Sequence, residues 1–171
     1  MKWSLREKLI IVFMTAGFAL PLRILGEEAS VTYAPTPYGG NFGIGLELGD
    51  PGGWGASGKI WIDRLNAFQP AVKLGDRVAI LQLDYLWHDF DLIHMKTDNG
   101  DMPFYIGVGG DLALERTADL AVRGPVGLSY IFNKKDVPLD IFLQIVPTLW
   151  FFGGGGSSFY LYGELGSRYY F

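Results

Sequence analysis

The chain of 171 residues contains no cysteine, which excludes a disulfide framework, a thiolate metal site and lipid attachment at an N-terminal cysteine. It has only two histidines, His88 and His94, and their spacing matches no recognised metal-binding motif. Its serines lack the strand-turn-helix context of a nucleophile elbow. The sequence therefore predicts no metal, no cofactor and no catalytic residue.

Long apolar runs are missing beyond the N-terminus, although the mean hydropathy of +0.20 is high for a soluble domain. Aromatic residues make up 15% of the chain, and there are 24 glycines. This composition favours strands and tight turns over helices. Any contact with lipid would therefore be made through strands with alternating faces rather than through an apolar helix.

The N-terminus carries three bases ahead of an apolar segment from Leu9 to Leu20. About a dozen apolar residues are few for a bilayer-spanning helix, which needs roughly 20, so the pattern predicts a secretory signal peptide over residues 1–26. Cleavage is expected after Gly26 or near Gly17 and Ala19. A retained N-terminal anchor helix is the alternative interpretation.

Residues 27–41 hold two prolines and two glycines without periodicity and predict an extended lead-in to a barrel domain over 42–171. Cleavage after Gly26 would remove four bases and one acid, which leaves a strongly acidic chain. An acidic chain lacks the basic surface that a phosphate backbone requires. No nucleic acid is expected as a partner.

From residue 42 onward, apolar and polar side chains alternate at period two in eight segments separated by turn signals. An even number of strands, each of about ten residues, predicts an all-β fold, an eight-stranded antiparallel up-and-down transmembrane β-barrel. Pro70 lies within one strand, where we expect a bulge. The predicted strands are 42–49, 55–63, 66–74, 78–88, 103–112, 120–132, 138–150 and 159–171.

The faces opposite the apolar ones carry five acids and four bases. The interior of an eight-stranded barrel is only just wide enough to be filled by side chains, and charges enclosed there must be paired. The nearly balanced set favours a salt-bridged plug; a proton or ion path, or a catalytic carboxylate pair, is the alternative. The predicted interior network is Glu47, Lys59, Lys73, Asp84, Asp111, Arg123, Asp140, Glu164 and Arg168.

Four segments carry a resemblance to a known class: LDYLWHDFDLI (83–93), VRGPVGLSYIF (122–132), PLDIFL (138–143) and SRYYF (167–171). The chain resembles small outer-membrane β-barrels of the outer-membrane-protein-A or -X type, and it is most similar to a family of uncharacterised eight-stranded barrels in that group. The resemblance implies a place in the bacterial outer membrane, in contact with its lipid. It also implies that the terminal aromatics Tyr169 and Phe171 are an assembly signal read by the barrel assembly machinery. It brings no activity and no extracellular partner.

With both termini on the periplasmic side, the connection 89–102 falls where turns are normally short, so either that turn is long or the preceding strand continues past His88. The predicted function is a porin-like but closed barrel with a structural or interaction role and no catalysis. One alternative is a lipid-modifying barrel enzyme that uses His88 or a carboxylate near the rim. Another is a soluble periplasmic calycin-like carrier, whose apolar face would point inward around an apolar ligand.

Overall fold

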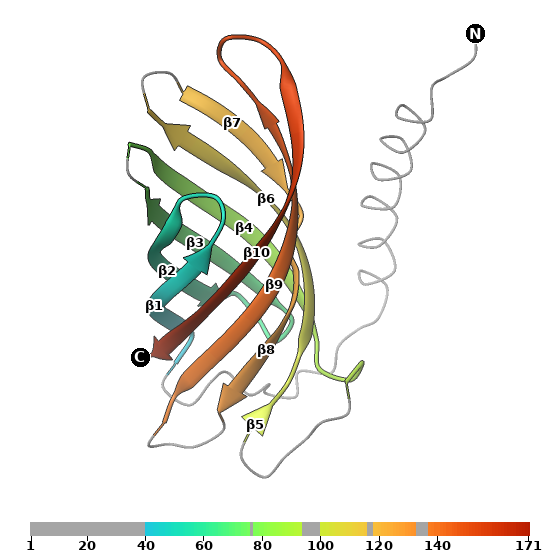
Figure 1. Cartoon of the computed structure of the whole chain (residues 1–171). Helices are drawn as coiled ribbons and strands as arrows, with labels where there is room; N and C mark the ends of the chain where they lie inside the picture. Colours follow the sequence, from blue (N-terminus) through green and yellow to red (C-terminus); the bar gives the residue numbers. More distant parts are fainter. Residues whose placement is uncertain (1–39, 76, 94–99, 116–117, 133–136) are drawn as a thin grey trace, which may run out of the picture. The chain divides into compact units, whose positions relative to one another are not determined.

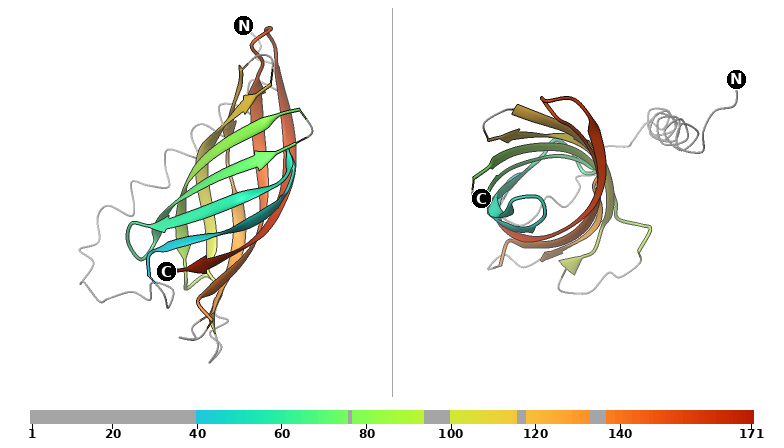
Figure 2. Two further views of the ribbon diagram at one scale, coloured as in Figure 1. Left: turned by 90° about the vertical axis from the view of Figure 1, so that its left-hand side faces the viewer. Right: turned by 45° about the horizontal axis from the view of Figure 1, so that its top comes forward.

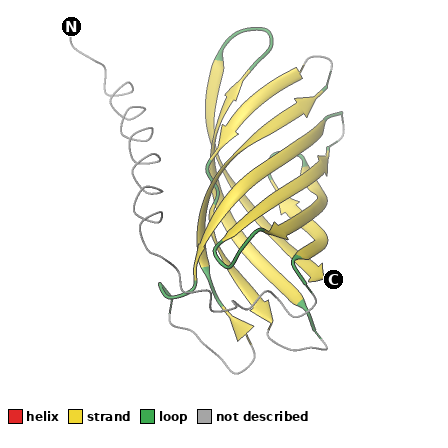
Figure 3. Cartoon of the chain, turned by 180° about the vertical axis from the view of Figure 1, so that it is seen from behind, coloured by secondary structure: helices red, strands yellow, loops and turns green. Residues whose placement is uncertain are grey.

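The computed structural model describes residues 40–75, 77–93, 100–115, 118–132 and 137–171. The predicted signal peptide over 1–26, most of the lead-in over 27–41, and His94 lie outside these residues. Within the described ranges, no helix is long and apolar enough to span a bilayer. The regular elements of this part of the chain are all strands (Figure 3).

The strands form one antiparallel sheet that closes on itself as an eight-stranded barrel (Figures 1 and 2). With β5 and β6 taken as one interrupted strand and β7 and β8 as another, strands that follow one another in the chain are neighbours, and β10 pairs with both β9 and β1, which closes the sheet. The predicted all-β, eight-stranded antiparallel barrel is therefore confirmed. The elements are β1 Phe42–Gly49, β2 Gly53–Trp61, β3 Asn66–Leu74, β4 Ala79–Asp89, β5 Gly100–Asp101, β6 Phe104–Leu114, β7 Ala118–Arg123, β8 Val126–Phe132, β9 Leu139–Phe151 and β10 Ser157–Tyr170.

Two of the eight strands are each interrupted once. The short β5 and the longer β6 pair with β8 in one continuous register, Gly100 opposite Phe132 and Phe104 opposite Leu128. In the same way, β7 and β8 keep one register against β6 and β9. The interruptions fall at Pro103 and Pro125 because proline has no N–H to give to the ladder.

The bulge expected at Pro70 is wrong. Ser57 pairs with Ala71 and Ile60 pairs with Phe68, so the register between β2 and β3 is the same on both sides of the proline and no residue is inserted. A Cβ built on Gly58 would lie 3.2 Å from Pro70 Cγ. The missing side chain at Gly58 thus leaves room for the proline ring within an unshifted ladder.

Strand β4 ends at Asp89 and the next strand begins at Gly100, so the connection between them is long and the strand does not continue far past His88. The end of β4 and the short β5 lie at the same end of the barrel as the start of β1 and the end of β10 (Figure 1). Phe90, directly after β4, is only 9% exposed and packs with Trp61 and Tyr170. The long connection therefore begins by turning a ring toward the core.

Side chains alternate strictly between the two faces of the barrel wall. The buried positions of β9, for example, run from Asp140 to Trp150 in steps of two, and Ile141, Leu143 and Ile145 between them are exposed. Among the charged residues of the described strands, only Asp89 at the end of β4 is exposed. The outer face is apolar and the inner face is charged.

Candidate functional site

The structure places all nine sequence-predicted charged residues inside the barrel, each no more than 2% exposed. Every one stands at an inward position of its strand, because successive residues of a strand point to opposite faces. The small residues beside them make space: a Cβ on Gly109 would collide with the Asp84 carboxylate, and one on Gly127 would lie 2.6 Å from the Tyr105 hydroxyl.

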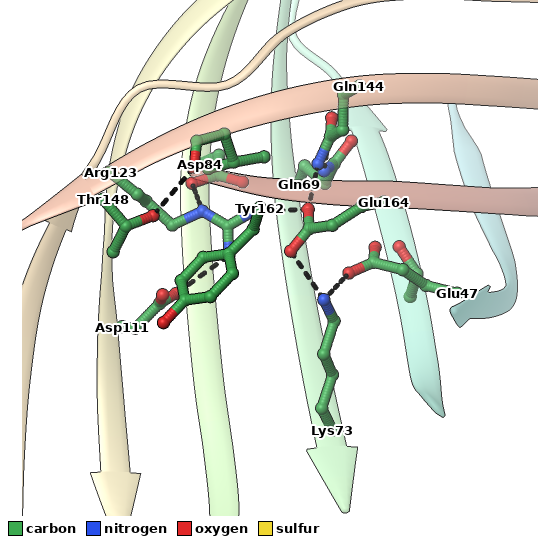
Figure 4. A network of polar contacts seen from close by, with 12 residues as sticks. Glu47, Gln69, Lys73, Asp84, Asp111, Arg123, Gln144, Thr148, Tyr162 and Glu164 are labelled. Atoms are coloured by element: carbon green, nitrogen blue, oxygen red, sulfur yellow. Dashed lines mark hydrogen bonds and ion pairs between the residues drawn. The ribbon is translucent and has the colours of Figure 1, made fainter. Parts of the chain in front are cut away.

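An acidic cluster occupies the middle of the interior (Figure 4). Lys73 of β3 places Nζ 2.9 Å from Glu47 of β1 and 2.6 Å from Glu164 of β10. Since β3 and β10 are not neighbours in the sheet, the Lys73–Glu164 contact crosses the interior. One ammonium group thereby ties three strands together.

Arg123 is the second base of this cluster. Its guanidinium lies 3.1 Å from Asp84, 3.0 Å from Asp111 and 2.6 Å from Glu164, carboxylates that come from β4, β6 and β10. Glu164 therefore contacts both bases, and it also accepts a hydrogen bond from the Gln144 amide. Removing Glu164 would deprive both cations of a partner.

A second cluster surrounds Asp140 of β9. The carboxylate lies 3.6 Å from Lys59 Nζ and 3.5 Å from Arg168 Nη1, and it accepts hydrogen bonds from Ser129 at 2.6 Å and Tyr170 at 3.0 Å. This single acid therefore serves two bases. This cluster therefore has one more base than acids, and Arg168 makes further contacts that accommodate its positive charge.

Those contacts involve two neighbours on different strands. Arg168 donates from Nε and Nη2 to Ser57 Oγ at 3.1 and 2.9 Å, and its guanidinium lies 3.8 Å over the Phe142 ring. The planar guanidinium can do both, since it stacks on a ring and presents donors at its edge.

Uncharged polar side chains, which were not among the predicted network residues, link the network. The Tyr105 hydroxyl donates to Gln144 Oε1 at 2.7 Å, and Gln69 lies at 3.5 Å from the same oxygen. Both glutamines occupy inward positions, as do Ser57 and Ser129. The same period-two pattern that marked the charges could have marked these residues.

Apolar side chains close the interior on both sides of the charges. At the end of the barrel where β1 begins and β10 ends, the buried cluster is Trp61, Ala67, Phe90, Ile131 and Tyr170. Toward the opposite end, Ile80, Ala113, Ala121 and Trp150 pack with Val78 and Tyr162. The charged network is thus filled and capped rather than open along the barrel axis.

His88 packs against the apolar cluster at the end of the barrel where β1 begins. Its Nδ1 lies 3.1 Å from the Leu65 carbonyl oxygen, and its ring lies 4.4 Å from Trp61 and 5.3 Å from Tyr105 between ring centroids. At 4% exposure the imidazole packs inside the barrel and not on an accessible rim. Among the described residues, no group of three or more histidines and acids is arranged to hold a metal ion.

The two assembly-signal residues face outward. Tyr169 is 46% exposed and Phe171 is 64% exposed, and their rings meet edge to face at 5.1 Å. Similar outward aromatic pairs lie on other strands near the same end of the barrel. They are Phe68 with Tyr85, Tyr85 with Trp87, and Tyr130 with Phe132.

The soluble-carrier alternative required the apolar faces to point inward. They point outward, and the charges that this alternative would place on the surface are buried, so that interpretation is wrong.

Comparison with protein-family models, with curated proteins and with solved structures found no significant match for this chain.

Proposed function

We propose that this chain is a small transmembrane β-barrel of the bacterial outer membrane, similar in design to barrels of the outer-membrane-protein-A or -X type. Its role is structural or interactive, without catalysis. The observation that carries the proposal is the inversion of polarity: a charged, fully buried interior enclosed by an apolar, exposed outer face. Lipid is the solvent that suits such a surface.

The extent of the apolar surface supports this assignment. Soluble monomers rarely expose contiguous apolar patches larger than a few hundred square ångströms. Here every complete strand contributes exposed apolar side chains, among them Leu46 at 61%, Leu143 at 59% and Leu161 at 65%. Where each strand has a neighbour on both sides, the closed sheet also satisfies the backbone within the wall, as a bilayer requires.

The positions of the outward aromatic side chains also support contact between the outer face and lipid. Trp87, Tyr130 and Tyr169 face outward near the end of the barrel where β1 begins and β10 ends, while Trp54 and Phe159 stand at the other end. Amphipathic rings gather at the two interfaces of transmembrane barrels. In this proposal the two sets of rings mark the two boundaries of the apolar band.

The interior supports a closed barrel rather than a channel. Two networks of buried ion pairs fill its middle, and apolar clusters lie on either side of them. Charges held in mutual pairs do not line a water-filled path. The lipid-modifying alternative loses its best candidate, since His88 is enclosed by Trp61, Phe90 and Tyr105.

In this proposal residues 1–26 direct the chain out of the cytoplasm, and the barrel assembly machinery inserts it by way of Tyr169 and Phe171. Membrane fractionation combined with gel migration tests the assignment. The full-length protein should enter the detergent-soluble outer-membrane fraction and change its migration on boiling, as folded barrels do. Recovery in the soluble periplasmic fraction without detergent would refute the proposal.

A further inference from the structure

The barrel wall has a step where β10 meets β1. Strand β10 pairs with β9 from Ser157 to Tyr169, but with β1 only from Glu164 to Tyr170, because β1 ends at Gly49. The β9–β10 hairpin consequently projects well beyond the turn that joins β1 to β2 (Figure 1). Along Ser157–Gly163, β10 therefore has a neighbour on one side only among the described strands.

The backbone groups at this step point to the open side. In an antiparallel ladder, each residue directs its N–H and its C=O to the same neighbour, and successive residues alternate. Phe171 donates to the carbonyl of Phe42, the first residue of β1, while Tyr170 donates to Pro138 on the β9 side. Counting back in steps of two from Phe171, Phe159 and Leu161 direct both backbone groups to the free edge.

This edge lacks two of the usual protections of an edge strand, charge and proline. Natural edge strands are guarded by charges, prolines, bulges or covering loops. Residues 157–163 contain no charge and no proline. Phe159 and Leu161 are 64% and 65% exposed, and the rings of Tyr160 and Tyr162 stack at 5.6 Å on the other face of the strand.

We propose that the Ser157–Gly163 edge of β10 is a docking site for an extended, uncharged segment of a partner polypeptide. The segment adds as an antiparallel strand along the line that β1 leaves at Gly49. Phe159 and Leu161 present two free N–H and two free C=O groups at strand spacing, and the backbone of an extended peptide matches them. Hydrocarbon cannot form hydrogen bonds with these groups. The absence of charge from the edge fits an uncharged segment.

A second copy of this chain in the same membrane does not fit the site. Its β10 would be related by rotation about the membrane normal, and strands tilted by about 40° would then cross at roughly 80° instead of lying side by side. The edge belongs to the barrel whether or not the barrel spans a membrane, so the docking proposal can fail while the proposed function stands.

Proline substitutions at neighbouring residues can test the free edge of β10 separately from the edge that pairs with β9. Leu161→Pro removes an N–H that has no partner on the described strands and should leave the barrel folded. Tyr160→Pro, one residue away, removes an N–H directed at β9 and should weaken the hairpin. The probe is a fluorescent Val-Thr-Val-Thr-Val-Thr-Val peptide, titrated against the detergent-folded full-length protein while its anisotropy is recorded.

The wild-type barrel should bind the probe, and folded Leu161→Pro should bind it at least about tenfold more weakly. Amide hydrogen exchange on the wild type gives a second measurement that needs no variant. The probe should slow exchange at Phe159 and Leu161 and leave Tyr160 unchanged. Equal binding by wild type and Leu161→Pro, no binding at about 1 mM peptide, or unchanged exchange at Phe159 and Leu161 would each overturn the proposal.

Discussion

Lys73 Nζ lies 2.6 Å from Glu164 Oε1, a contact that joins β3 to β10 across the interior of the barrel and spans 91 residues of sequence. Neither side chain is exposed beyond 1%. A buried ion pair adds little net stability over an apolar pair. Removing one partner, however, leaves the other charge buried without a partner and away from water, which is strongly destabilising. The interior network should therefore be intolerant of single substitutions.

Glu164→Gln keeps the volume of the side chain and removes the charge shared by Lys73 and Arg123. We expect the free energy of unfolding to fall by about 3 kcal/mol, measured as a shift of the urea midpoint on gels that separate folded from unfolded barrel. Ser167→Ala on the outer face of the same strand is the control and should change it by less than about 0.5 kcal/mol. Wild-type stability of Glu164→Gln would show that the network does not hold the strands.

Substitutions on the outer face should show a dependence on depth. Leu143→Arg near the middle of β9 should destabilise the barrel in lipid vesicles by about 2–4 kcal/mol. Leu139→Arg, on the same face at the end of the strand, should cost only about 0–1 kcal/mol. Equal effects at the two positions would argue against an apolar band around the barrel.

The barrel should not conduct. In planar bilayers the purified protein should give no large, stable conductance, and liposomes that contain it should not swell in small sugars, because the Asp140 and Glu164 networks fill the interior between two apolar caps. A porin serves as the positive control. Stable openings at the wild-type sequence would contradict a closed interior.

Phe171→Ala should slow assembly of the barrel. In vesicles that contain the barrel assembly machinery, the folded fraction should rise more slowly than for the wild type, while the stability of the folded product should change little. Phe159→Ala is a matched control, because Phe159 is equally exposed and lies near the other end of the same strand. Equal rates for the two variants would remove the terminal aromatic from the assembly signal.

Much of the fold could be predicted because the alternation of apolar and polar residues within each strand indicates which side chains share a face. Arg168 was predicted to face inward from local alternation alone, and it is buried, whereas Phe171, three residues further on, is exposed. The inward set could be predicted without knowledge of the partner strands, because successive side chains of one strand point to opposite faces.

The partners inside the barrel could not be predicted, because they depend on how the closed sheet is staggered. Nothing local indicates that Lys73 meets Glu164 rather than Asp111, or that β10 runs on past the end of β1. The bulge expected at Pro70 failed for a related reason: it depended on Gly58, a residue on the neighbouring strand whose position opposite the proline is set by the register. The local pattern of a strand determines which face a side chain occupies, and the register of the whole sheet determines which side chains it contacts.

The central claim is that the apolar face contacts lipid and the charged face does not, and spin labelling tests it most directly. The chain has no cysteine, so single cysteines placed in turn along residues 141–146 of β9 can each carry one label without background. In vesicles, labels at 141, 143 and 145 should be accessible to oxygen dissolved in the hydrocarbon, and labels at 142, 144 and 146 should be protected from it. The reverse alternation, or none at all, would contradict the account.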